Sequence, residues 1–129
     1  MIRNGCLSIL AAVALAACGR GGATAALDAP IQLEPGQSVQ LESARFEVTF
    51  NSIASDSRCA TDVACVWAGE VVVQLAIRNE GRTTQHAVRE TQSASAGGYR
   101  VTVLQVLPAR KSTGPIAPAD YRMTLKITR

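Results

Sequence analysis

The stretch Val71-Val72-Val73-Gln74-Leu75-Ala76-Ile77-Arg78 decides the fold class of this chain. From Val71 to Ile77 every second residue is a large apolar one, so the alternate positions form one continuous apolar face. A period of two is the pattern of a strand with one buried face, and β-branched side chains favour an extended backbone. Residues 71–78 are therefore predicted to form a β-strand rather than a helix.

The same alternation recurs along the chain, with turn residues between the segments. Turns are predicted at Glu34-Pro35-Gly36-Gln37 and Asn79-Glu80-Gly81-Arg82, and loops at residues 93–98 and 108–118. The pattern predicts six or seven short strands and no helix, and therefore an all-β fold. We expect a small antiparallel β-sandwich that is immunoglobulin-like only in the loose architectural sense. The further predicted strands are residues 38–43, 46–50, 99–107 and 121–127, and residues 83–90 are predicted to form a polar, outer strand.

Length and composition exclude several classes of protein. The chain has 129 residues, which fits one domain, and its 18% charged and 47% hydrophobic residues exclude a disordered polymer or a bundle of membrane spans. The net charge of +3 comes from scattered basic residues, so no nucleic-acid partner is expected. Four of these basic residues are Arg78, Arg82, Arg89 and Arg100, and we expect them to form a solvated face. The alternative is that this face makes weak contact with anionic lipid or lipopolysaccharide.

The N-terminus carries the pattern of an export signal. Residues 7–17 are apolar or small, a run too short to span a bilayer, and residues 1–17 are therefore predicted to be a signal peptide. The sequence Leu15-Ala16-Ala17-Cys18 resembles a bacterial lipobox, which implies a lipid on Cys18 that anchors the mature protein to a membrane. The alternative is ordinary secretion with a free thiol at Cys18.

The residue after Cys18 is Gly19, not the Asp that resembles an inner-membrane retention signal. By analogy we expect an outer-membrane anchor with the domain in the periplasm of the bacterial envelope. Residues 18–30 are rich in Gly and Ala and are interpreted as a lipidated cysteine followed by a flexible tether. The β-sandwich domain is then expected to span residues 31–129.

Two cysteines remain after export and lipidation. Cys6 leaves with the signal peptide and Cys18 takes the lipid, so only Cys59 and Cys65 can pair. An exported protein folds in an oxidising compartment, and we therefore expect a Cys59–Cys65 disulfide.

The cysteines lie in a block that resembles a family of small, largely uncharacterised bacterial exported proteins and lipoproteins. The resemblance rests on the turn Gly36-Gln37-Ser38 and on the block that runs from Asp56-Ser57-Arg58-Cys59 to Cys65-Val66-Trp67-Ala68-Gly69. Members commonly have Pro after the first cysteine, where this chain has Ala60. The resemblance implies fold and location, and it brings no established activity.

Residues 56–70 form the candidate binding loop, and Asp56, Arg58, Asp62 and Trp67 are its candidate binding residues. The structural alternative pairs Arg58 with Asp56 or Asp62, places Trp67 over the disulfide at one end of the core, and uses Gly69 for a bulge or a close backbone approach. A calcium site from Asp56, Asp62 and Glu70 is a remote alternative, because the spacing matches no known calcium loop.

No catalytic motif is recognised. His86 is the only histidine and lies in a polar strand, where a solvent-facing side chain is the simpler interpretation. We therefore expect no enzyme, no cofactor and no metal. The predicted function is a lipid-anchored, non-catalytic binding or assembly module that contacts an envelope protein through the loop. The alternatives are a protease-inhibitor-like module that presents the same loop and a purely structural envelope lipoprotein.

Overall fold

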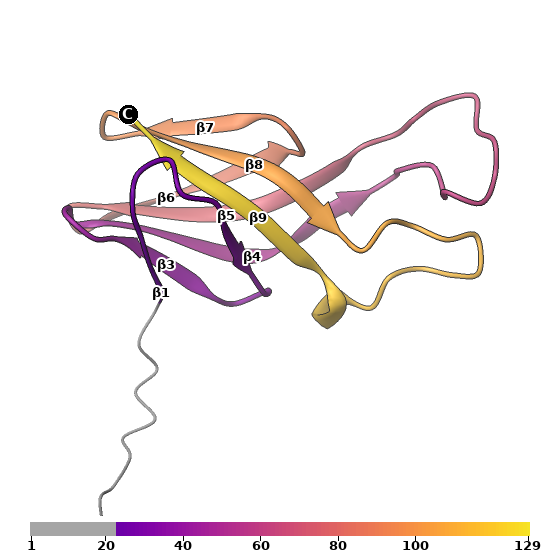
Figure 1. The fold of residues 1–129 in the computed structure, drawn as a ribbon, viewed down its shortest axis with the longest axis horizontal. Coiled ribbons are helices and arrows are strands. Elements are labelled where there is room, and N and C mark those ends of the chain that lie inside the picture. Colours follow the sequence, from indigo (N-terminus) through magenta and orange to yellow (C-terminus); the bar gives the residue numbers. More distant parts are fainter. Residues whose placement is uncertain (1–22) are drawn as a thin grey trace, which may run out of the picture.

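The computed structural model describes residues 23–129, which form two β-sheets packed face to face (Figure 1). This confirms the predicted all-β sandwich. The five-stranded sheet has the order β1 (Ala23–Ala25), β3 (Ser38–Leu41), β4 (Phe46–Asp56), β5 (Val71–Asn79) and β6 (Arg82–Arg89). The four-stranded sheet has the order β2 (Ile31–Leu33), β9 (Arg122–Thr128), β8 (Tyr99–Leu107) and β7 (Ser93–Ala96).

Strand β5 lies at the centre of the fold, as its sequence predicts. Every second residue from Val71 to Ile77 is at most 1% exposed, and β5 pairs antiparallel with β4 on one side and β6 on the other. The inward faces of β8 and β9 supply the opposite half of the core, because Val101, Val103 and Leu125 are fully buried. The core is thus formed by the alternate positions that were predicted to be apolar faces.

The structure contains nine strands among the described residues, whereas six or seven were predicted. One additional strand, β7, lies in the segment that was expected to be a loop. Gly97 and Gly98 have φ angles of 57° and 81°, which permits a tight turn that pairs β7 with β8. Strand β4 also continues beyond residue 50, through two register irregularities, and brings Asp56 to the end of the sandwich.

The predicted domain boundary at residue 31 is wrong, because the folded part already includes β1. β1 pairs with β3 in parallel, Ala25 is buried, and the amide of Asp28 donates to the carbonyl of Ile127 at 2.9 Å. Small residues without periodicity can still pair through their backbones, which composition alone does not reveal. The predicted signal peptide (residues 1–17) and the lipidation site Cys18 lie outside the described residues. Within residues 23–129 no helix is long and apolar enough to cross a membrane.

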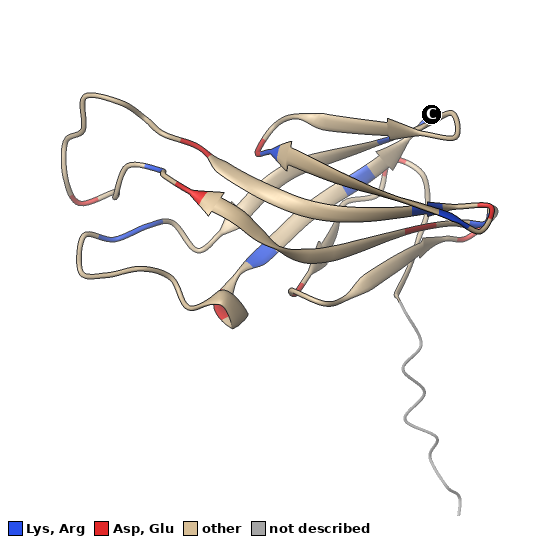
Figure 2. Ribbon diagram, turned by 180° about the vertical axis from the view of Figure 1, so that it is seen from behind, with Lys and Arg blue, Asp and Glu red and all other residues tan. Residues whose placement is uncertain are grey.

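Two long connections project from one end of the sandwich. They join β4 to β5 (residues 57–70) and β8 to β9 (residues 108–121), and they are seen side by side from both directions (Figures 1 and 2). β1, where the chain enters the fold, lies toward the opposite end of the long axis (Figure 1). The β4–β5 connection contains the whole candidate binding loop except Asp56.

We expect a chain that starts at Ile31 to be less stable than one that starts at Ala23. Loss of β1 removes its pairing with β3 and the cover that Ala25 gives the core, so the free energy of unfolding should fall by about 2–4 kcal/mol. Urea denaturation of the two chains measures the difference. Equal stabilities would show that β1 contributes nothing and that the domain begins at β2.

Candidate functional site

The β4–β5 connection begins as a continuation of the two strands. The amide of Ser57 donates to the carbonyl of Glu70 at 2.8 Å, and the amide of Cys59 donates to the carbonyl of Ala68 at 2.8 Å. Gly69 lies between these pairs with φ of 68°, and a Cβ atom there would collide with the Ser57 carbonyl. The close backbone approach expected at Gly69 is therefore confirmed.

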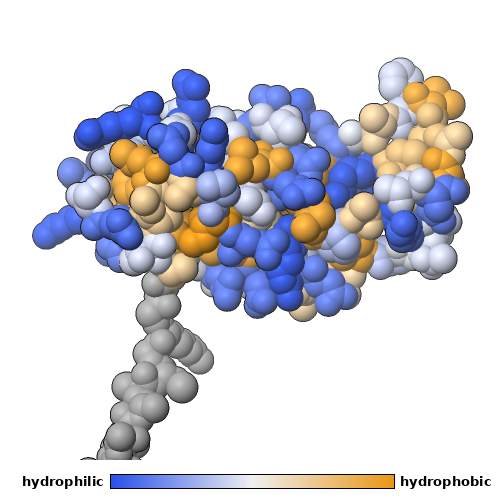
Figure 3. All heavy atoms as spheres, in the orientation of Figure 1, coloured by the Kyte–Doolittle hydropathy of each residue, from blue (hydrophilic) through white to orange (hydrophobic). Residues whose placement is uncertain are grey.

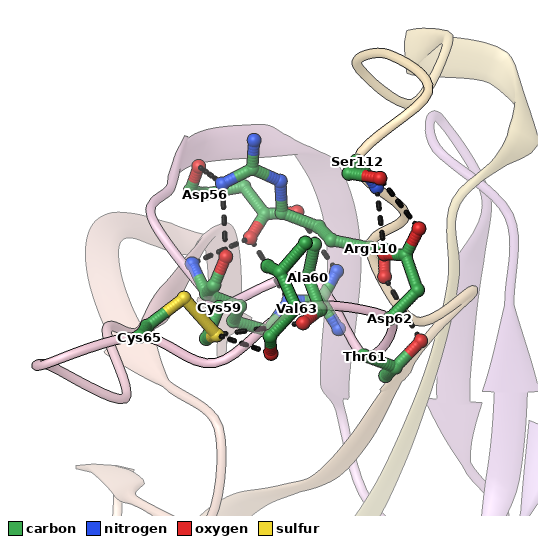
Figure 4. Close-up of a disulfide and its surroundings, with 10 residues drawn as sticks. Asp56, Cys59, Ala60, Thr61, Asp62, Val63, Cys65, Arg110 and Ser112 are labelled. Carbon is green, nitrogen blue, oxygen red and sulfur yellow. Dashed lines mark hydrogen bonds and ion pairs between the residues drawn. A yellow bond between two sulfur atoms is a disulfide. The ribbon is translucent and has the colours of Figure 1, made fainter.

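Beyond these pairs the loop is closed by the predicted disulfide. Cys59 and Cys65 are bonded, with their Cα atoms 5.9 Å apart (Figure 4). The amide of Val63 also donates to the carbonyl of Ala60 within the closed ring. A covalent closure on top of a short ladder limits the conformations of residues 59–65 in the folded and the unfolded chain.

Asp56 accepts hydrogen bonds from two side chains at the base of the loop. Arg58 donates from Nε to Oδ1 at 2.9 Å and from Nη2 to Oδ2 at 2.8 Å, and the Tyr121 hydroxyl donates to Oδ2 at 2.9 Å. The Asp56 and Arg58 side chains are only 8% and 15% exposed. This confirms the structural interpretation that pairs Arg58 with Asp56, and it leaves neither group free to bind a ligand.

The protonation of this cluster follows from its contacts. Partial burial disfavours a charged carboxylate, but the hydrogen bonds from Arg58 and Tyr121 outweigh it, so the pKa of Asp56 lies below its usual value. The pKa of Tyr121 is raised by burial and by its hydrogen bond to Asp56. The hydrogen bond to Asp56 also raises the pKa of Arg58, so the ion pair is fully charged at neutral pH.

Arg58 joins the two long connections. Its guanidinium donates to the carbonyl of Val106 at 2.9 Å and to that of Pro108 at 3.1 Å. In return, Nη1 of Arg110 donates to the carbonyl of Arg58 at 2.9 Å. Because Arg58 belongs to one connection and Arg110 to the other, this exchange fastens the loops to each other.

Asp62 makes a second link between the connections. Its Oδ1 accepts from the amide of Ser112 at 2.9 Å and its Oδ2 accepts from the Ser112 hydroxyl (Figure 4). These hydrogen bonds lower the pKa of Asp62. Nearby, the amide of Thr61 donates to the carbonyl of Arg110 at 3.0 Å. Asp62 is thus exposed but already occupied by partners within the chain.

Trp67 differs from the other three candidate residues. Its side chain is 82% exposed, so it neither covers the disulfide nor fills the end of the core, and that expectation is wrong. Val66 is 92% exposed and Val63 is 49% exposed. We call Val63, Val66 and Trp67 the apolar tip, and Figure 3 shows hydrophobic residues gathered at this end of the molecule. No charged residue occurs in the seven positions 63–69.

The structure does not bring the proposed calcium ligands together. Asp56 pairs with Arg58, Asp62 with Ser112, and Glu70 forms an ion pair with Arg89 at 3.0 Å. Across residues 23–129 no group of three or more His, Cys, Asp or Glu side chains is placed to hold a metal ion. His86 lies on β6, where its Nε2 is 2.8 Å from the Thr84 hydroxyl.

The sequence did not identify the second loop as part of this site. Arg110, Ser112 and Tyr121 contact the first loop across 50 or more residues of chain, and a contact of that range leaves no periodic signal. Comparison of the chain with models of protein families, with curated proteins and with solved structures gives no match. The interpretation of the site therefore rests on its own geometry.

Replacement of Asp56 by Asn should destabilise the domain by about 2–3 kcal/mol, because Arg58 then loses its charged partner in a mostly buried position. The folded pKa of Asp56 lies below 3.8, so its contribution is complete above that pH and is lost as the pH falls through the folded value. The variant should therefore show a weaker loss of stability in acid than the wild type. Urea titrations at several pH values measure both effects. If the variant lost as much stability in acid as the wild type, the prediction would be contradicted.

A second prediction concerns the close approach at Gly69. Gly69→Ala should cost about 2–4 kcal/mol, since it adds a steric clash to the strain of a positive φ. Gly81→Ala is the matched control, because Gly81 also has a positive φ but nothing lies within 4 Å of its added Cβ. Thermal unfolding of both variants separates strain from clash. If the two substitutions lower the stability equally, the close approach to the Ser57 backbone does not contribute to the effect of Gly69→Ala.

Proposed function

We propose that the protein is a non-catalytic binding module of the bacterial envelope, which a lipid on Cys18 anchors to the outer membrane. Its binding surface is the apolar tip, and its partner is an envelope protein with an apolar cleft. The observation that carries the proposal is the exposure of Trp67 and Val66 at the end of a fastened loop. The proposal revises the candidate site, because only Trp67 of the four predicted binding residues is free to contact a partner.

The loop that carries the apolar tip is held in place by several links, and the tip itself is exposed. A disulfide, a short ladder and the links to Arg110 and Ser112 hold the loop that carries the tip. A loop that is already ordered loses little conformational entropy when it binds, so more of its contact energy appears as affinity. Tryptophan is also a side chain that frequently dominates binding energy when it enters a pocket.

The shape of the tip indicates a concave partner. Three side chains on one loop are far fewer than the roughly 20–30 residues a side of a standard protein interface. A protruding loop gains more contact area in a cleft than on a flat surface. The predicted export signal, the resemblance to exported bacterial proteins and the disulfide support the envelope as the place where this contact occurs.

A protease cleft is the second candidate for the concave partner. The observation that favours it is the disulfide-closed ring at Cys59–Cys65, which fixes the exposed backbone beside Trp67. Inhibition of a purified envelope protease by the domain would distinguish this candidate from an assembly contact. A purely structural lipoprotein would bind nothing through the tip.

The test compares a tip variant with a matched control in affinity capture. The mature chain is immobilised and exposed to detergent-solubilised envelope of the source bacterium. The double substitution V66S/W67S should abolish capture of a specific protein, whereas L27S should retain it, since Leu27 is a partly exposed apolar residue outside the loop. The tip side chains are exposed, so the stability of V66S/W67S should stay within about 0.5 kcal/mol of the wild type.

Capture that survives in folded V66S/W67S would overturn the tip as the binding surface. Absence of any specific partner would favour the purely structural lipoprotein. Cell fractionation with a Cys18→Ser chain tests the anchor separately. The wild type should sediment with membranes and the variant should remain in the soluble periplasmic fraction.

A further inference from the structure

We propose that the outer face of the four-stranded sheet rests on the anionic phospholipid headgroups of the bilayer that holds Cys18. This proposal builds on the lipid anchor of the proposed function, but it concerns a different surface from the apolar tip. It assigns to the sheet the role of orienting the domain on the membrane.

All charged residues in the strands of the four-stranded sheet are basic. Strands β2, β7, β8 and β9 contain no Asp or Glu, and their three charged residues are Arg100, Arg122 and Lys126. These positions alternate with buried ones such as Val101, Met123 and Leu125, so all three lie on the outer face. Arg122 pairs with Glu34 at 3.1 Å, whereas Arg100 and Lys126 form no ion pair within the described residues.

The five-stranded sheet has a different charge pattern, although it also carries basic residues. Glu47 lies opposite Arg78 in the register of β4 and β5, and Arg89 is paired with Glu70 at 3.0 Å. The basic residues there are thus accompanied by acidic ones. The face expected from the sequence included Arg78, Arg82 and Arg89 with Arg100, but the structure divides these four between different sheets.

The register of β8 and β9 places two of these basic residues close together. Arg100 lies opposite Thr128 and Lys126 lies opposite Thr102, so Arg100 and Lys126 are diagonal neighbours on the same face, about 7–8 Å apart at their backbones. Their register partners Thr128 and Thr102 have short side chains, and Arg100 is exposed while Lys126 is partly exposed. Figure 3 shows hydrophilic side chains on this side of the molecule, interspersed with hydrophobic ones.

A short length of chain separates the proposed anchor from the fold. Only four residues, 19–22, lie between Cys18 and the first residue of β1. Fully extended, the five Cα–Cα steps from Cys18 to Ala23 span at most about 18 Å. A lipid on Cys18 would therefore hold Ala23 close to the bilayer, so that the domain can turn one face onto the headgroups and bring its cations within the Debye length of about 8 Å at physiological salt. At such proximity two or three basic residues suffice to select an orientation.

The two lysines of the chain allow a direct test. Lys126 lies on the proposed contact face and Lys111 lies in the β8–β9 connection. A chain that begins at Cys18 and carries no acyl group is coupled through the Cys18 thiol to a maleimide lipid in phosphatidylcholine vesicles or in phosphatidylglycerol-rich vesicles. A membrane-impermeant acylating reagent then labels both lysines, and mass spectrometry gives the rate at Lys126 relative to Lys111.

We expect the relative rate at Lys126 to fall about fivefold on phosphatidylglycerol-rich vesicles and to be unchanged on phosphatidylcholine. Concentrated salt should abolish the protection, because it screens exposed charges. Arg100→Gln should weaken the protection, whereas Arg82→Gln, on the other sheet, should preserve it. Equal labelling on both vesicles would overturn the proposal, and protection of Lys111 instead would show that the loop end faces the membrane.

The coupling supplies the anchor chemically, and the readout does not involve the apolar tip. A negative result here would therefore leave the proposed function intact. Failure of the capture or fractionation experiments would in turn leave the labelling result interpretable as a property of the folded domain.

Discussion

The ion pair between Asp56 and Arg58 is the interaction on which the functional end of this domain depends. Asp56 ends β4, Tyr121 precedes β9, and the guanidinium of Arg58 bonds to the carbonyls of Val106 and Pro108 at the end of β8. One charged pair thus connects both sheets where the sandwich opens into loops. Because the pair is mostly shielded from water and fully hydrogen-bonded, its geometry is fixed, and the loops inherit that order.

The alternation of apolar residues predicted the sandwich because burial of one sheet face acts at every second position. The disulfide was predicted because export leaves only Cys59 and Cys65 to pair. By contrast, β1 and β7 escaped prediction, since their small residues pair through backbone groups that any sequence carries. Trp67 was predicted to be a binding residue, with a place over the disulfide as the structural alternative, and no local pattern reveals that its loop extends beyond the sandwich.

The polar residues of the candidate site stabilise the loops and are not available for contact with a partner. Asp56, Arg58 and Asp62 have the residue types of a binding site, yet each is satisfied within the chain. The residues that remain free are apolar, at Val66 and Trp67. The charged groups of the loop thus stabilise its conformation, and the surface that remains available to a partner is hydrophobic. The proposed membrane-facing sheet lies on another side, so both contacts can form together.

The parallel pairing of β1 with β3 has a mechanical consequence. If a partner holds the tip while a lipid holds Cys18, tension enters the domain through Ala23 and leaves it at the other end of the long axis (Figure 1). The first element to bear load is then a three-residue edge strand, not the core. Its detachment would lengthen the connection to the membrane up to β2 while Phe46 and Leu75 stay packed. Detachment of β1 would thus relieve tension between anchor and partner before the core unfolds.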